Sequence, residues 1–180
     1  MRNILFSTLF AFCTFLITQP SAAQPAAPKP LNYQGQVIAN LDYTAGNLIK
    51  LAEAIPAEKY SWRPAPGVRS VSEVFMHVTN ANYFLLGHMG VERPADLPRN
   101  SEKAVTEKAQ VVAWLKKSIE MVMQTVRNTS DADLQKPVRL FNTDNNYQGV
   151  ILQMVSHIHE HLGQSIAYAR SNGIAPPWSE

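Results

Sequence analysis

Residues 148–172 read QGVILQMVSHIHEHLGQSIAYARSN, and this stretch predicts a long amphipathic helix. Its apolar residues recur every three or four positions, a spacing that places them on one face of a helix. That face comprises Ile151, Met154, Val155, Ile158, Leu162 and Ala169. Asn172 and Gly173 supply a stop signal, and Pro176-Pro177 prevents the helix from resuming. A helix of this kind needs other helices against which to bury its apolar face.

Two histidines, His157 and His161, stand four residues apart within this stretch. Residues at i and i+4 lie on one face of a helix, one turn apart, so two imidazoles can reach the same divalent cation. A third histidine, His77, lies in an earlier amphipathic segment. Three neutral imidazoles with an open fourth position are typical of a catalytic zinc-type site rather than a closed structural one.

Three further segments carry the same helical spacing. They cover residues 32–54, 71–89 and 107–128. Ser70 and Glu73 form the Ser-x-x-Glu pattern of a capping box, so the second helix should begin directly after Ser70. Thr106 is the expected cap of the third helix, and residues 138–141 in the following link give a weak strand signal. Four helices of this length predict an all-α four-helix bundle, in which metal sites are built from facing side chains.

The helical phase places three histidines at the edge of the core. At about 100° per residue, His77, His157 and His161 each lie about 60–100° from the centre of a buried stripe. His159 points away from its two neighbours, and His88 lies about 16 Å along the helix from His77, so we exclude both as ligands of the same ion. A histidine on a helix flank is also typical of a hydrogen-bonded side chain without metal, and that alternative stays open.

The N-terminal segment has the features of a secretory signal. Residues 1–23 combine a basic start, an apolar run and Ser21-Ala22-Ala23, which suits cleavage after Ala23. Residues 24–30 are rich in alanine and proline and predict an extended tether to a domain of residues 31–180. The apolar run is shorter than the roughly 20 residues of a membrane span. We therefore expect an exported protein, periplasmic or secreted, without stable membrane insertion after cleavage.

Composition narrows the chemistry of the exported part. Cys13 is the only cysteine and lies in the predicted signal, which excludes thiolate ligands, disulfides and a cysteine nucleophile from the rest of the chain. Arg2 is the only charged residue of that signal, so the remainder carries 15 Lys and Arg against 14 Asp and Glu. No basic block indicates a nucleic-acid partner. A substrate for such a site is expected to be a small molecule of unknown charge.

Three pieces of the sequence carry a family resemblance. The first runs from Trp62-Arg63-Pro64 through Gly67-Val68-Arg69-Ser70 to Glu73-Val74-Phe75-Met76-His77. The second is His157-x-x-x-His161-x-Gly163-Gln164, and the third is Ala-Arg-Ser-Asn-Gly-Ile-Ala-Pro-Pro at residues 169–177. With these pieces the chain resembles the DinB-like (damage-inducible) superfamily of metal-binding four-helix bundle proteins.

The resemblance implies several properties beyond those that the residues give directly. It implies an up-up-down-down bundle with one long crossover, and a divalent ion, zinc or nickel, held by His77, His157 and His161. It also implies that a homodimer is possible. Characterised members of the family include transferases and isomerases that use low-molecular-weight thiols, whose pKa the metal lowers.

Two functions fit these expectations. One is an enzyme of thiol-transferase or hydrolase type, whose substrate or water takes the open coordination position. The other is a non-catalytic bundle that binds metal or a small ligand; a plain helical interaction domain is the alternative without metal. No general base is assigned, because Glu160 points away from the core and Glu73 is used in the capping box. Tyr168 is a candidate only.

Overall fold

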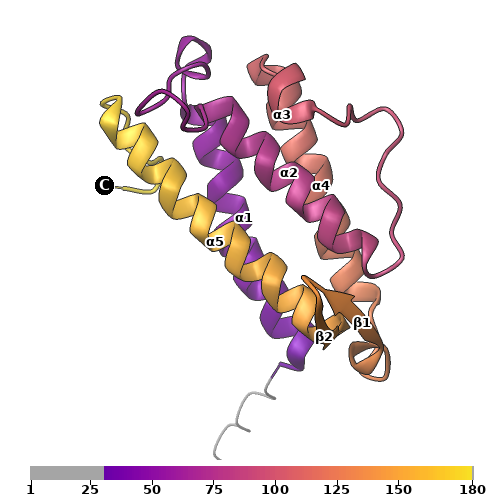
Figure 1. Cartoon of the computed structure of the whole chain (residues 1–180). Coiled ribbons are helices and arrows are strands. Elements are labelled where there is room, and N and C mark those ends of the chain that lie inside the picture. Colours follow the sequence, from indigo (N-terminus) through magenta and orange to yellow (C-terminus); the bar gives the residue numbers. More distant parts are fainter. Residues whose placement is uncertain (1–30, 180) are drawn as a thin grey trace, which may run out of the picture. The chain divides into compact units, whose positions relative to one another are not determined.

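The computed structural model describes residues 31–179 (Figure 1). Its four long helices are α1 (Tyr33–Ala54), α2 (Val71–Gly87), α4 (Lys108–Asn128) and α5 (Tyr147–Ser171). The shorter elements are α3 (Ser101–Ala104), 3₁₀ turns at Ala57–Lys59 and Asp133–Gln135, and strands β1 (Pro137–Leu140) and β2 (Thr143–Asn146). The all-α four-helix bundle is thus confirmed, with one small hairpin added. The predicted signal and tether lie outside the described residues.

Side-chain caps fix where three of the helices begin. The predicted capping box of α2 is present: Ser70 Oγ accepts from the Glu73 amide at 3.4 Å, and the Ser70 amide donates to Glu73 Oε2 at 2.9 Å. Asn32 caps α1 and Asn146 caps α5, each through its side-chain oxygen. Such caps satisfy amides that have no partner within the helix. The expected Thr106 cap of α4 is wrong, because Glu107 occupies the N-cap position and its side chain makes no capping bond.

The core lies between the four long helices. Its largest fully buried side chains are Leu41, Leu48, Leu51, Ile55, Phe75, Met76, Tyr83, Leu86, Leu115, Ile151, Met154 and Ile158. Burial of apolar surface of this kind is the main favourable term in folding, so the four stripes hold the bundle together. Among residues 31–179, no helix has both the length and the apolarity needed to cross a bilayer.

Contacts at the helix ends establish the direction of each helix. The Tyr33 hydroxyl donates to the Gln148 carbonyl at 3.0 Å, so α1 and α5 begin at the same end of the bundle. Lys108 at the start of α4 donates to the carbonyl of Ile55, just past the end of α1, at 2.8 Å. The Tyr168 hydroxyl near the end of α5 donates to the carbonyl of Arg69, just before α2, at 3.1 Å. The order is therefore up-down-down-up.

The expected up-up-down-down order is wrong, and the connections give the reason. The link from α1 to α2 reverses at one end of the bundle, where the Tyr60 hydroxyl donates to the Ala52 carbonyl at 2.6 Å and the Ser72 amide donates to the Tyr60 carbonyl at 2.9 Å. The single long crossover instead joins α2 to α3 and α4, and it runs along the outside of the bundle (Figure 1). The crossover returns the chain to the end of the bundle at which α2 began, so α2 and α4 run in the same direction. They are the only consecutive pair of the four long helices that does so.

The link between α4 and α5 contains an antiparallel hairpin. β1 pairs with β2 in the register Leu140 to Thr143, which leaves a loop of two residues, Phe141 and Asn142. Both have positive φ, 51° and 63°, as a type I′ hairpin turn requires. The weak strand signal at residues 138–141 corresponds to β1, whereas β2 was not predicted.

Candidate metal centre

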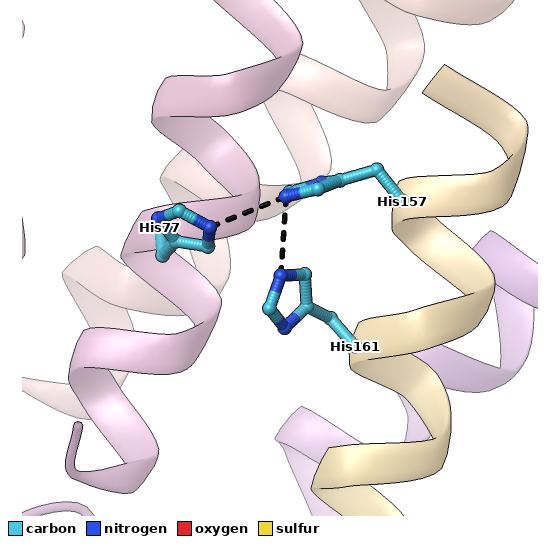
Figure 2. Close-up of side chains that lie close together, drawn as sticks. All are labelled: His77, His157 and His161. Carbon is cyan, nitrogen blue, oxygen red and sulfur yellow. Dashed lines mark hydrogen bonds between the residues drawn. The ribbon is translucent and has the colours of Figure 1, made fainter. Parts of the chain in front are cut away.

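Three histidine side chains converge between α2 and α5 (Figure 2). Nε2 of His157 lies 3.2 Å from Nε2 of His77 and 3.1 Å from Nε2 of His161. All three candidate donor atoms lie within 4.8 Å of one another. Because α2 and α5 are antiparallel neighbours, one residue of α2 faces one turn of α5. The structure thus brings together the three residues that the sequence singled out, while metal ligation itself stays a prediction.

The two other histidines lie apart from this cluster, as expected. His159 is exposed, and its Nδ1 lies 2.9 Å from the Val155 carbonyl of the preceding turn. His88 caps the end of α2, and its ring centroid lies 5.1 Å from that of Phe84. Neither belongs to the group of side chains that could share an ion.

Glutamate and glutamine side chains orient two of the three imidazoles. His77 Nδ1 lies 3.0 Å from Glu102 Oε1, and His161 Nδ1 lies 2.7 Å from Gln164 Oε1. The pKa of Glu102 is lowered, so its carboxylate is ionised. Glu102 Oε1 and Gln164 Oε1 can then only accept a hydrogen bond, so Nδ1 of His77 and Nδ1 of His161 each carry a proton. The Nε2 atoms of His77 and His161 are then left with lone pairs that face the third imidazole. Partners of this kind fix the tautomer of metal-binding histidines.

Two further contacts hold those orienting groups in place. Glu102 Oε2 accepts from Arg69 Nε at 2.9 Å. Gln164 Nε2 donates to the Tyr168 hydroxyl at 3.2 Å, and that hydroxyl donates to the Arg69 carbonyl at 3.1 Å. Arg69 therefore ends both chains of contacts, one through its guanidinium and the other through its backbone. Gln164 thus orients an imidazole directly, and Tyr168 supports it through Gln164.

Glu102 is the residue that sequence reasoning missed. It lies on α3, a helix of four residues at the end of the long crossover. A segment this short carries no apolar periodicity, so no pattern could place its carboxylate beside His77. Arg69 was noted only as part of a motif, and its pairing with Glu102 depends on the same crossover.

The pKa values of this region leave the α5 imidazoles unprotonated, the form in which a histidine can bind a metal. Burial, followed by the neighbouring His161 and His77, lowers the pKa of His157 to about 4. Burial also lowers the pKa of His161, against the opposing hydrogen bond with Gln164. For Glu102, burial acts to raise the pKa, but hydrogen bonds from Arg69 and His77 outweigh it and leave the pKa lowered. At neutral pH the two α5 imidazoles are neutral and Glu102 is ionised.

Hydrogen bonds alone cannot satisfy all the ring nitrogens of the three histidines. His157 faces two Nε2 lone pairs and can donate its single Nε2 proton to only one of them. Its Nδ1 is buried and has no partner among residues 31–179. Two nitrogens at 2.0–2.1 Å from a tetrahedral zinc ion are about 3.3 Å apart. Two of the three donor separations here, 3.1 and 3.2 Å, are close to this value, and all three donor atoms lie within 4.8 Å of one another. The donor set therefore fits a divalent cation with three imidazole ligands.

A pocket of about 300 Å³ lies directly beside the histidines. Its lining residues come from α2, α3, α5 and the hairpin: His77, Asn80, Ala81, Phe84, Leu85, Glu102, Phe141, Gln153 and His157. This volume is at the lower end of the range for small-molecule sites, and the wall combines apolar side chains with a few polar groups, as such sites do.

Comparisons with known proteins agree with this architecture. The crystal structure of a DinB-like protein from Bacillus cereus has a TM-score of 0.69 and 18% identity, covering 80% of this chain and 95% of that one. A conserved protein from Enterococcus faecalis gives 0.66 and 14%, covering 78% and 97%. A DinB-like protein from Bacillus subtilis gives 0.61 and 18%, covering 77% and 92%. Identities this low show a shared fold alone, and no curated protein matches the chain.

The family match covers more of the sequence than any single motif. The DinB superfamily model matches residues 40–165, a span that contains His77, His157 and His161 together with Glu102 and Gln164. Because this match extends over more than half of the chain, the protein belongs to the DinB superfamily.

Proposed function

We propose that this protein is an exported, divalent-metal-dependent enzyme that acts on a small molecule held beside the three histidines. The observation that carries the proposal is the convergence of three Nε2 atoms next to a pocket that His77 and His157 themselves line. A structural site would be closed by a fourth protein ligand. Among residues 31–179, no fourth histidine, cysteine or carboxylate joins the cluster. Export is supported by the signal pattern of residues 1–23.

His77, His157 and His161 would hold the ion, which we expect to be zinc or nickel. When bound, such an ion supplies Lewis acidity, which lowers the pKa of a water or thiol in the open position. The protein's own contribution is to position the imidazoles. Glu102 holds the Nδ1 proton of His77, and Gln164 holds that of His161.

The ionisable residues around the pocket favour thiol transfer over hydrolysis. His77, Glu102 and His157 are the ionisable side chains of the lining within the described part of the chain. Glu102 is already engaged by His77 and Arg69, so it is a positioning residue rather than a free general base. Once the ion has ionised a bound thiol or water, neither nucleophile needs a separate base. Hydrolysis also calls for a general acid to protonate its leaving group, and the described lining holds no free one, whereas thiolate attack on an electrophile with a stable leaving anion does not.

The test compares two reactions on the same metal-loaded protein. Conjugation of glutathione or cysteine to 1-chloro-2,4-dinitrobenzene reports thiol transfer, and cleavage of p-nitrophenyl acetate reports hydrolysis. We expect metal-dependent conjugation that is lost in His157→Ala and kept in His159→Ala. Conjugation at equal rates in both variants would refute the proposal.

The alternative is a bundle that binds metal or a small ligand without turnover. It is favoured by the same feature, the lack of a free acid or base in the described lining. Stoichiometric metal in the absence of either activity, with a panel of thiols and electrophiles, would support this alternative over the enzyme.

A further inference from the structure

Two exposed phenylalanines form one wall of the pocket beside the histidines. Phe84 lies on α2 and is 53% exposed, and Phe141 lies at the tip of the hairpin and is 64% exposed. Their rings stack with centroids 5.9 Å apart and an interplanar angle of 24°. Both side chains line the pocket that His77 and His157 also line. Their exposed faces are therefore apolar surface available to a molecule in that pocket.

The backbone at Phe141 is unfavourable for the residue that occupies it. Phe141 has a φ of 51°, and a type I′ turn strongly prefers asparagine, aspartate or glycine at this position. A bulky residue with positive φ is an outlier that the surrounding structure has to hold in place. Arg139 bridges this turn, donating to the Asn142 carbonyl at 3.0 Å and to Asp144 Oδ1 at 3.3 Å. The turn thus retains a phenylalanine in a conformation that disfavours it, and the ring of this phenylalanine lines the pocket.

The pocket has two chemically different ends. His77 and Phe84 are seven residues apart on α2, which corresponds to about 10 Å along the helix. Gln153 lies one turn before His157 on the antiparallel α5, so it lies between those ends. Asn80 is also between them; its Oδ1 already accepts from Arg93 and Ser101, which leaves its amide protons for a ligand. A matching molecule has an apolar part, a hydrogen-bond acceptor and a group facing the histidines.

We propose that Phe84 and Phe141 form a specificity subsite for a flat apolar group, an aromatic ring, on the substrate. The pocket of about 300 Å³ suits a single-ring compound with a short side chain. Aromatic rings prefer offset stacking or edge contacts with other rings, and the paired phenylalanines offer both. The assignment of the other end of the molecule to the histidines rests on the proposed function, whereas ring binding does not require the ion.

The test uses two probes that share a metal-binding head group, benzohydroxamate with a ring and acetohydroxamate without one. Their affinities are measured by calorimetry on zinc-loaded wild type, Phe84→Ala and Phe141→Gly. The matched control is Tyr43→Ala, which removes a ring of 66% exposure from α1, away from this pocket. Metal content is measured on every sample.

We expect wild type and Tyr43→Ala to prefer benzohydroxamate. Phe84→Ala and Phe141→Gly should each reduce that preference roughly tenfold, from lost apolar contact, with acetohydroxamate affinity and metal content unchanged. Phe141→Gly should unfold at the same or a higher urea concentration, because glycine accepts positive φ without strain. A preference that is equal in all four proteins would overturn the subsite.

Failure of metal binding is distinguished from failure of the subsite. If wild type holds no metal, the proposed function is wrong, and saturation-transfer NMR of benzohydroxamate on the same protein then tests the ring contact. Transfer to the ring protons that is weakened in Phe141→Gly but not in Tyr43→Ala supports the subsite. Equal transfer in the two variants refutes it.

Discussion

His77 and His157 are 80 positions apart in the sequence, yet their Nε2 atoms lie 3.2 Å apart. They come from antiparallel helices, α2 and α5, so the site forms only when these helices have packed together. A cation held by both would link two halves of the chain that are distant in sequence. Metal binding and folding stability should therefore be coupled in this protein.

The first prediction is that zinc stabilises the folded domain. A ligand at 100 times its Kd stabilises the native state by about 2.7 kcal/mol, which raises the Tm of a domain of this size by roughly 5–10 °C. Calorimetric melting of the metal-free protein with and without zinc measures the shift. His161→Ala should abolish the shift and His159→Ala should retain it. A shift of equal size in both variants would place the zinc elsewhere.

The second prediction concerns Glu102. Removing the carboxylate that holds the His77 tautomer should weaken zinc binding about 10–100-fold, as loss of a partner that orients a metal ligand does in other proteins. Competition of Glu102→Ala with a chromophoric chelator measures the affinity. Glu120→Ala, which removes an exposed glutamate of α4, is the control. Unchanged affinity in Glu102→Ala would mean that the contact with His77 at 3.0 Å does not orient the ring.

The third prediction is the pH dependence of metal affinity. Protons compete with the ion for the imidazoles, so affinity falls as pH drops through the ligand pKa values. The pKa of His157 is lowered from 6.5 to about 4, and that of His161 is also lowered, mainly by burial. We therefore expect these two ligands to stay available to the ion below the ordinary histidine value, so that measurable zinc affinity remains at pH 6. Titration of zinc affinity from pH 7.5 to 4 tests this, and complete loss by pH 6 would contradict it.

The fourth prediction concerns acid stability and Glu73. Burial acts to raise its pKa, but hydrogen bonds from Lys103, the Ser70 amide and Arg63 outweigh it and lower the pKa from 4.5 to about 2. A lowered carboxyl pKa stabilises the fold above about pH 4.5, and this stabilisation is lost as pH falls toward 2.

Glu73→Gln should therefore cost roughly 2 kcal/mol at pH 7, and its stability should change less than that of wild type between pH 4.5 and 2. Urea unfolding at several pH values measures both effects. Glu120→Gln, which makes the same chemical change at an exposed position, should follow the wild-type curve. If the stability of Glu73→Gln fell as steeply as that of wild type between pH 4.5 and 2, groups other than Glu73 would cause the acid sensitivity.

Much of this fold is predictable from local patterns. Apolar spacing predicts the four long helices to within two residues at every end. The Ser70–Glu73 capping box was recognisable because its two bonds span only three residues. The helical phase also identified His77, His157 and His161 and separated them from His159. These predictions succeed because each depends on residues within a few turns of one another.

The features that sequence reasoning missed depend on the connections. The direction of α2 follows from a reversal held by Tyr60, a contact with no sequence signature. Glu102 reaches His77 only because the long crossover returns to the start of α2, where Arg69 pairs with the same carboxylate. Phe141 has positive φ at a turn position that its residue type disfavours, so the residue preferences of type I′ turns do not indicate this hairpin. Contacts between separate elements decide the first two, whereas the third depends on a local turn.

Elemental analysis of the protein, purified without a histidine tag, tests the three-histidine site most directly. Wild type, His157→Ala and His159→Ala are each supplied with zinc or nickel, dialysed and measured. We predict about one ion per chain in wild type and His159→Ala and none in His157→Ala, since three imidazole ligands are needed for a catalytic-type site. No metal in any of the three, or equal metal in all of them, would contradict a site formed by His77, His157 and His161.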